Sequence, residues 1–164
     1  MVKELNEVAV APDTFQVSAE PILMTAELRG ALALCLHDEG RGQGGLLHLR
    51  FIDGSGRPSD VTDNTLSSVL VVLDKFKRAV LGNAARREDI HARILAHALP
   101  PMHSDEPSAN LVDLIKADLA DGRIECGTQT LRRVETVRVC FQPFEGRAWI
   151  AGPRDRRTAV RASR

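Results

Sequence analysis

The chain has 164 residues, which is the size of one ordinary domain and enough to bury a core without disulfide or metal support. Basic and acidic residues balance at 22 each, so the overall charge favours neither nucleic acid nor an anionic membrane as a partner. Three irregularly spaced cysteines exclude a disulfide framework, and no apolar run is long enough for a signal peptide or a membrane span, so we expect a cytoplasmic protein with reduced thiols and no membrane insertion.

The first third of the sequence predicts β-structure. Five short apolar runs, separated by turn residues, indicate strands: 7–10, 14–17, 22–28, 31–37 and 45–52. The last two flank a polar segment with regularly spaced glycines, 38–44, which is typical of a hairpin. Beyond this segment the spacing of apolar residues changes to that of a helix, and the remaining predicted elements are a mixture of helices and strands.

A helix is expected over 66–80, because its apolar residues recur at helical spacing; Ser59 or Thr62 caps its start and Gly82 ends it. A second helix runs from about Ser108 to Gly122. Four further strands are predicted: 92–98, 123–126, 134–141 and 147–151. The fold class is therefore α+β, a single domain of layered β-sheets with two helices packed on one face.

The two ends of the chain differ in character. We expect residues 1–152 to form the domain. Residues 153–164 are rich in arginine and lack apolar periodicity, so we interpret them as a basic, disordered tail. An electrostatic contact of this tail with an acidic partner is the alternative.

The hairpin allows one geometric prediction. With its midpoint between Glu39 and Gly40, residues whose numbers sum to 79 face each other, which places Ala31 opposite His48 and Cys35 opposite Gly44. Cβ atoms of facing residues are about 5 Å apart, whereas four residues along a strand span about 13 Å. A cysteine at position 31 would therefore reach the imidazole, and Cys35 would not.

Four landmarks resemble the chemoreceptor glutamine deamidase family (CheD). Residues 25–38 resemble its stretch of threonine, leucine-glycine-serine-cysteine and alternating apolar residues ending in aspartate. Residues 44–48 resemble its glycine-glycine-x-x-histidine, 110–112 the start of its second helix, and 141–147 its closing aromatic-to-glycine turn. The landmarks span residues 25 to about 150 in the family's order, and the resemblance implies an α/β/β sandwich.

The resemblance also implies a chemistry. In this family a thiolate attacks the side-chain amide of a receptor glutamine, an imidazole takes the thiol proton, and a hydroxyl orients the imidazole. Carried over by position, Thr25 is the orienting hydroxyl and His48 the base, but the nucleophile position is Ala31. A methyl group can neither attack nor ionise, so we expect the deamidase step to be lost.

Other positions depart from the family pattern as well. Arg29 and Gly30 replace its glycine-serine, Ala96-His97 stands where it has a central glycine pair, and a later glycine pair is missing from 129–133. These departures favour natural divergence over a single engineered change. The resemblance predicts a chemotaxis protein that acts as a binding or regulatory module on methyl-accepting chemoreceptors or on a CheC-like signalling phosphatase.

Several alternatives remain open. An active protein-glutamine deamidase could use a relocated thiol, for which Cys126 and Cys140 are candidates, while Cys35 is interpreted as a core residue. His48 itself could be only a structural residue of a half-buried strand. The spacing of the remaining histidines, His91, His97 and His103, is not that of a zinc site. No dinucleotide-binding motif is present either, so we expect neither a metal nor another cofactor.

Overall fold

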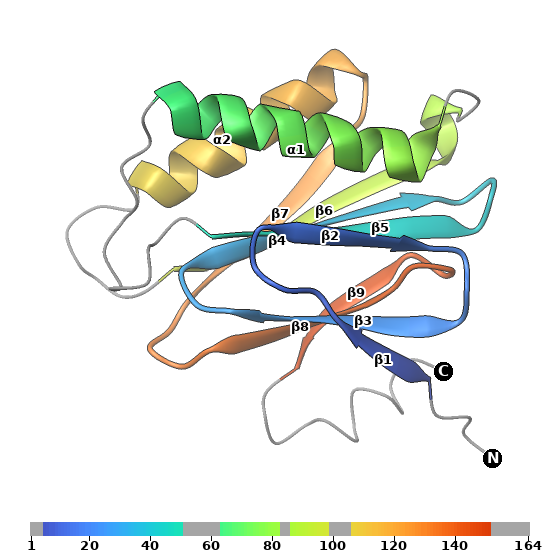
Figure 1. The fold of residues 1–164 in the computed structure, drawn as a ribbon, viewed down its shortest axis with the longest axis horizontal. Helices are drawn as coiled ribbons and strands as arrows, with labels where there is room; N and C mark the ends of the chain where they lie inside the picture. Colours follow the sequence, from blue (N-terminus) through green and yellow to red (C-terminus); the bar gives the residue numbers. More distant parts are fainter. Residues whose placement is uncertain (1–4, 51–62, 83–85, 99–105, 152–164) are drawn as a thin grey trace.

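The computed structural model describes residues 5–50, 63–82, 86–98 and 106–151. Within these ranges the chain forms nine strands and two α-helices, arranged in two mixed sheets and one helical layer (Figure 1). Several predicted features lie outside the described residues: the helix caps Ser59 and Thr62, the strand end Ile52, His103 and the tail 153–164. The strand bounds, in chain order, are Asn6–Ala9 (β1), Thr14–Ser18 (β2), Ile22–Leu28 (β3), Ala31–Asp38 (β4), Gln43–Arg50 (β5), Ile90–Ala98 (β6), Cys126–Arg132 (β7), Val137–Gln142 (β8) and Arg147–Ala151 (β9).

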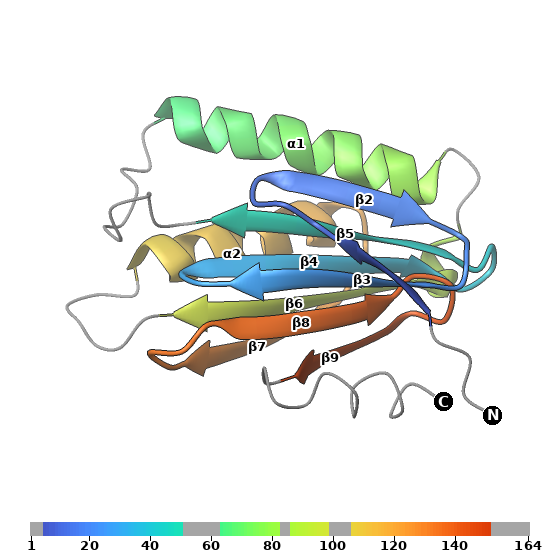
Figure 2. The ribbon, with the colours of Figure 1, turned by 60° about the horizontal axis from the view of Figure 1, so that its bottom comes forward.

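The layers follow the order helices, five-stranded sheet, four-stranded sheet (Figure 2). The five-stranded sheet has the order β2-β5-β4-β6-β7 and the four-stranded sheet has the order β1-β3-β8-β9. Helices α1 (Asp63–Leu81) and α2 (Glu106–Asp121) cover the outer face of the five-stranded sheet. This arrangement confirms the predicted α+β class with both helices on one face.

The sequence of the central strand β4 is almost entirely apolar, and its place between two layers explains this. Every residue of β4 is buried, because both faces of the strand are covered. Leu32, Leu34 and Leu36 pack against the helices, while Ala31, Ala33 and Cys35 face the second sheet. We refer to the space between the two sheets as the inter-sheet core; small residues of β4 leave room in it for the side chains opposite.

The glycine pair at the start of β5 fits the strand between two layers. A Cβ on Gly44 would lie 2.7 Å from the carbonyl oxygen of Pro143, on the inter-sheet side. A Cβ on Gly45 would lie 2.8 Å from Cε1 of Phe76, on the helix side. Both distances are shorter than a carbon atom tolerates, so these glycines allow the close approach of both neighbouring layers.

Strand boundaries agree with the sequence prediction in most places and differ at the end of α2. The predicted strand 123–126 is wrong, since residues 122–124 form the turn that ends α2, with the amides of Gly122 and Ile124 bonded to the carbonyl of Leu119. Arg123 has a φ of 63° in that turn. The strand instead begins at Cys126 and runs to Arg132, parallel to β6 at the edge of the sheet. Neither described helix is long and apolar enough to cross a membrane.

Candidate functional site at one end of the sandwich

Position 31 lies where the chain crosses from one sheet to the other. Strand β3 ends at Leu28 in the four-stranded sheet, and β4 begins at Ala31 in the five-stranded sheet. The two-residue connection places Gly30 at a φ of 54°, a left-handed conformation that glycine adopts without strain. The side chain of Ala31 points into the inter-sheet core and is 1% exposed. The position that the resemblance assigns to the nucleophile therefore holds a buried methyl group.

The register of the hairpin differs from the prediction by two residues. His48 pairs with Ala33, while Ala31 pairs with Arg50 and Cys35 pairs with Leu46. The predicted pairs of Ala31 with His48 and of Cys35 with Gly44 were therefore wrong. A shift by an even number of residues keeps every side chain on its face, so Ala31, Cys35 and His48 still share the inter-sheet core.

The cause of the shift is the size of the turn. Asp38 and Gln43 are the last paired residues, so the loop has four residues instead of the shorter turn that the glycine spacing suggested. Arg41 fixes this loop through a 2.9 Å contact with the Asp38 carboxylate and a bond to the Leu81 carbonyl at the end of α1. As a result, positions 31 and 35 are both diagonal neighbours of His48, at about 7–8 Å between Cβ atoms.

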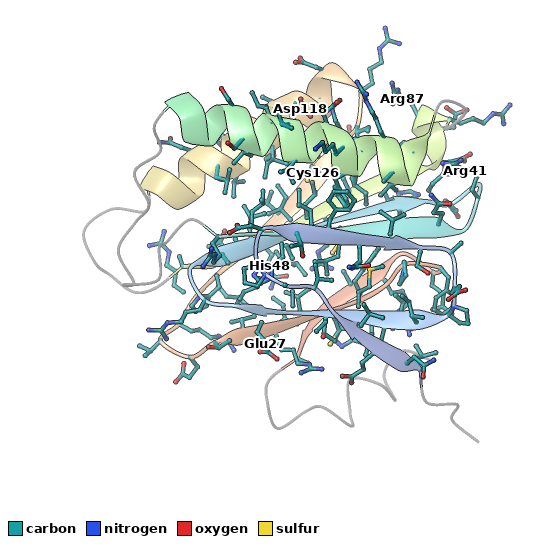
Figure 3. The ribbon with its side chains drawn as sticks, in the orientation of Figure 1. Glu27, Arg41, His48, Arg87, Asp118 and Cys126 are labelled. Atoms are coloured by element: carbon teal, nitrogen blue, oxygen red, sulfur yellow. The ribbon has the colours of Figure 1, made fainter. Side chains whose placement is uncertain are left out.

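His48 is a buried, neutral imidazole with a defined tautomer. It is 2% exposed and lies between the two sheets (Figure 3). Its Nδ1 is 2.9 Å from the carbonyl oxygen of Val10, which can only accept, so Nδ1 carries the proton and donates. Burial lowers the pKa of His48 below its ordinary value of 6.5, so the ring is uncharged at neutral pH. Nε2 consequently keeps its lone pair, which is the state a general base requires.

Thr25 is not the hydrogen-bonding partner of this imidazole. Met24, Ala26 and Leu28 of β3 face the inter-sheet core, so alternation along the strand turns the Thr25 side chain to the other face, opposite Cys140. The connection between Thr25 and His48 runs through the backbone, because the amide of Val10 donates to the Thr25 carbonyl at 2.8 Å. The hydrogen bond that the resemblance implies for the Thr25 hydroxyl is therefore made by the Val10 carbonyl.

His97 is a second histidine at this site, and the sequence prediction gave it no role. It lies at the end of β6 and pairs directly with Ala31 on the side of β4 away from His48. Its side chain is completely buried. Nδ1 accepts a hydrogen bond from the Gly30 amide at 3.0 Å, and Nε2 donates to the Arg133 carbonyl at 2.8 Å. Burial is the largest of the causes that lower the pKa of His97 below 6.5.

Three exposed arginine residues lie at this end of the sandwich. Arg50 forms two bonds to the Asp13 carboxylate through its guanidinium, at 3.0 and 2.7 Å, and its backbone amide bonds the same carboxylate. Arg29 and Arg133 are exposed, and their charges contribute to the lowered pKa of His97. This set of exposed residues, Arg29, Arg50 and Arg133, is called the arginine rim below.

None of the three thiols is placed as an activated nucleophile beside His48. Cys35 shares the inter-sheet core with His48, but burial raises the pKa of its thiol to about 12. Cys140 faces the outer side of the four-stranded sheet with Leu23, and burial raises its pKa as well. Cys126 packs on the helix side of its sheet, whereas His48 lies on the opposite face.

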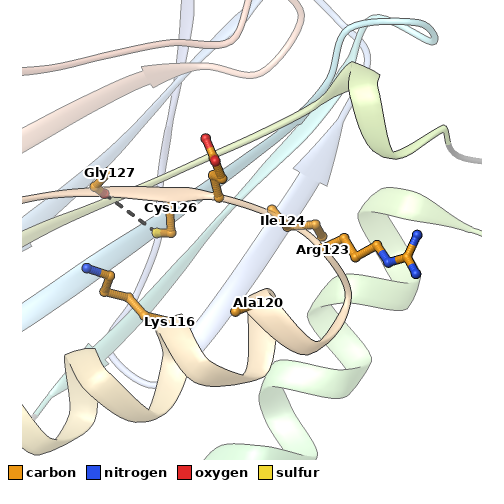
Figure 4. Close-up of a pocket in the computed structure, with 7 residues that line it drawn as sticks. Lys116, Ala120, Arg123, Ile124, Cys126 and Gly127 are labelled. Atoms are coloured by element: carbon orange, nitrogen blue, oxygen red, sulfur yellow. Dashed lines mark hydrogen bonds between the residues drawn. The ribbon is translucent and has the colours of Figure 1, made fainter.

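Cys126 lines an open groove of about 700 Å³ between α2 and β7 (Figure 4). Lys116 and Arg123 also line this groove, and the Lys116 charge partly offsets the burial that raises the pKa of Cys126 to about 11. The thiol contacts the Gly127 carbonyl at 3.5 Å and has no histidine beside it in the groove. Among the described residues, no group of three or more ligand-type side chains is placed to hold a metal ion.

No protein-family model matches the chain, but individual curated proteins do. The "Probable chemoreceptor glutamine deamidase CheD" of Burkholderia orbicola (strain MC0-3) is 26% identical over 145 residues, which cover 87% of this chain and 59% of that protein. The proteins of the same name from Burkholderia vietnamiensis and Thiobacillus denitrificans are 25% and 24% identical, over 87% and 86% of this chain and over 59% and 71% of their own lengths.

The chain thus spans 59% of the length of the Burkholderia orbicola protein. Among solved structures, YlmD from Geobacillus stearothermophilus shares 14% identity with a TM-score of 0.39, over 71% of this chain and 50% of that one. A match over 145 of the 164 residues includes the segment that carries Ala31, His48 and His97. Over most of its length, the chain is similar to curated proteins named as probable chemoreceptor glutamine deamidases, CheD.

Proposed function

We propose that this chain binds chemoreceptors in the cytoplasm as a regulatory module and does not deamidate them. One observation carries the proposal: the position where its relatives' chemistry needs a thiolate is the buried methyl group of Ala31. His48 remains a neutral imidazole with a free Nε2 lone pair, but no thiol with a lowered pKa lies beside it among the described residues. A CheC-like phosphatase is the second candidate partner, by analogy with the family.

The alternative function is an active deamidase that uses a relocated thiol. Of the three cysteines, Cys35 alone shares a face of the sheet with His48. Its pKa of about 12 leaves almost no thiolate at neutral pH, and only 3% of the residue is exposed. This geometry favours the binding module over the enzyme.

The arginine rim is the surface that we assign to the partner. Deamidation and methylation act on glutamine and glutamate side chains, so a receptor segment that carries them presents carboxylate and carboxamide groups. Exposed guanidinium groups bind such groups by charge-assisted, often bidentate hydrogen bonds. Arg29 and Arg133 project at the end of the sandwich where the nucleophile position lies, so a receptor segment bound there lies across the former active site.

Binding is tested with receptor cytoplasmic fragments by isothermal calorimetry. The double variant Arg29→Glu/Arg133→Glu should weaken binding by about tenfold or more, because charge reversal replaces attraction by repulsion. Lys75→Glu is the control for a charge reversal away from the rim: it reverses one exposed charge on α1, in the helical layer. Equal affinity of the rim variant and the control would remove the rim from the proposal, and absence of binding by the natural chain would remove the receptor.

A further inference from the structure

The imidazole of His97 lies directly beside the nucleophile position. In the antiparallel pair of β4 and β6, Ala31 and His97 are opposite each other, and both side chains point into the inter-sheet core. Cβ atoms of such a pair are about 5 Å apart. The methyl group of Ala31 leaves this space to the ring, which is fully buried.

Both ring nitrogens are engaged, in opposite roles. Nδ1 accepts from the amide of Gly30, and Nε2–H donates to the carbonyl of Arg133. Gly30 belongs to the connection that leads into β4, and Arg133 follows β7, so the ring joins the two backbone segments that border position 31. A second backbone bond, from the Arg133 amide to the Ala98 carbonyl at 3.3 Å, holds the same junction closed.

These contacts have two consequences for amide chemistry at position 31. Attack on a carboxamide requires the amide to reach the nucleophile, and Ala31 is 1% exposed behind the ring. It also requires N–H donors for the oxygen that becomes negative, a contribution worth about 10²–10³ in rate for one donor. The Gly30 amide, adjacent to position 31 in the chain, is occupied by Nδ1 of His97.

We propose that His97 closes this end of the sandwich to a carboxamide side chain, so that the site carries a second block independent of the missing thiol. This inference rests on the proposed loss of deamidation and gives a second cause for that loss, the His97 imidazole. Restoring a cysteine at position 31 alone therefore does not restore a reactive site. Removing the imidazole opens the space and frees the Gly30 amide at the same time.

The first test measures access with 2-chloroacetamide, which carries the same primary amide as a glutamine side chain and is displaced by a thiolate with release of chloride. Three proteins are compared: Ala31→Cys, Ala31→Cys/His97→Gly and Ala31→Cys/His91→Gly. His91 is the matched control, since it lies on the same strand and is paired with Glu39 far from position 31. Alkylation is followed by mass spectrometry of peptides, which separates the introduced thiol from the three natural ones.

We expect His97→Gly to raise the alkylation rate of the introduced thiol by about tenfold or more, because removal of the ring and its two hydrogen bonds makes local opening at position 31 easier, and we expect His91→Gly to leave the rate unchanged. His97→Ala, which keeps a Cβ on the strand, makes the same comparison if the glycine variant melts below the assay temperature. Equal rates with and without the imidazole would overturn the proposal.

The second test uses the natural thiol set and no electrophile. Hydrogen exchange at the Gly30 amide should be faster in His97→Ala than in the natural chain by about tenfold or more, since the acceptor of that amide is removed. His91→Ala should leave it unchanged. Both tests are independent of receptor binding and of deamidation by the natural chain, so failure of the proposed function would not alter their outcome.

Discussion

Gly45 should be intolerant of even one added methyl group, in contrast to Gly127 on the same sheet. An alanine Cβ at position 45 would lie 2.8 Å from the Gln16 carbonyl oxygen, 2.8 Å from Cε1 of Phe76 and 2.9 Å from Cγ2 of Val80. Phe76 and Val80 are completely buried, so neither side chain can move into solvent to relieve the contact. A Cβ at position 127 would meet nothing within 4 Å.

The expected magnitudes follow from these contacts. Overpacking a buried position costs about 1–3 kcal/mol, whereas a glycine-to-alanine change at an unstrained site stabilises by about 0.4–1 kcal/mol through the unfolded chain. Gly45→Ala should therefore lower the free energy of unfolding by about 1–3 kcal/mol, and Gly127→Ala should leave it equal or slightly higher. In a domain of this size each kcal/mol corresponds to about 2–4 °C in the melting temperature.

Urea unfolding followed by circular dichroism measures both variants. The double variant Gly45→Ala/Phe76→Ala adds a test of the contact itself: because the smaller side chain makes room for the new methyl group, its destabilisation should be less than the sum of the two single changes. Additive losses would refute the assigned contact. If Gly45→Ala were as stable as Gly127→Ala, the explanation of the glycine pair by layer packing would be wrong.

Three further predictions concern the buried polar groups. The folded-state pKa values of His48 and His97 lie below 6.5, so the unfolded chain binds more protons in acid than the folded chain. The free energy of unfolding should therefore be highest above about pH 6.5 and fall as the pH drops below it. His48→Asn should flatten this dependence in urea unfolding measured from pH 5 to 8. Arg138, which bridges two glutamates at 3.0 Å each, should cost about 1–2 kcal/mol when changed to Met, and added salt should narrow the difference from the natural chain. At pH 7.5, iodoacetamide should label the native chain more slowly than the urea-unfolded chain, because Cys35 and Cys140 are buried and the pKa of the half-buried Cys126 thiol is raised to about 11. Fast labelling of Cys35 or Cys140 in the native chain would contradict their burial.

The sequence predicted those elements whose signal is local. The strand Ile22–Leu28 and the end of α1 before Gly82 follow from apolar runs and from a residue with a φ of 58°, and both are where the pattern placed them. β7 was displaced because most of its residues are exposed and polar, as its position at the sheet edge requires, and so lack an apolar alternation. A strand of this kind is recognisable only from its partner.

The site was predictable in composition and less so in geometry. The face that carries Ala31 and His48 was predicted correctly, but the register depended on Arg41, whose contacts with the end of α1 fix the size of the turn. The position of His97 beside Ala31 was missed because it results from the pairing of β4 with β6, which are far apart in the chain. The sequence around a histidine in a buried strand does not indicate which residues will lie next to it in the sheet.

The central claim, that this chain has kept the fold but lost the deamidase step, is tested most directly by mass spectrometry of receptor cytoplasmic fragments after incubation with the natural protein. The curated relative from Burkholderia orbicola, which is named a probable chemoreceptor glutamine deamidase, serves as the positive control. The account predicts conversion of receptor glutamine to glutamate by the relative and none above the buffer blank by this chain. Conversion by this chain that disappears in His48→Asn would contradict the account and show that another nucleophile works with that imidazole.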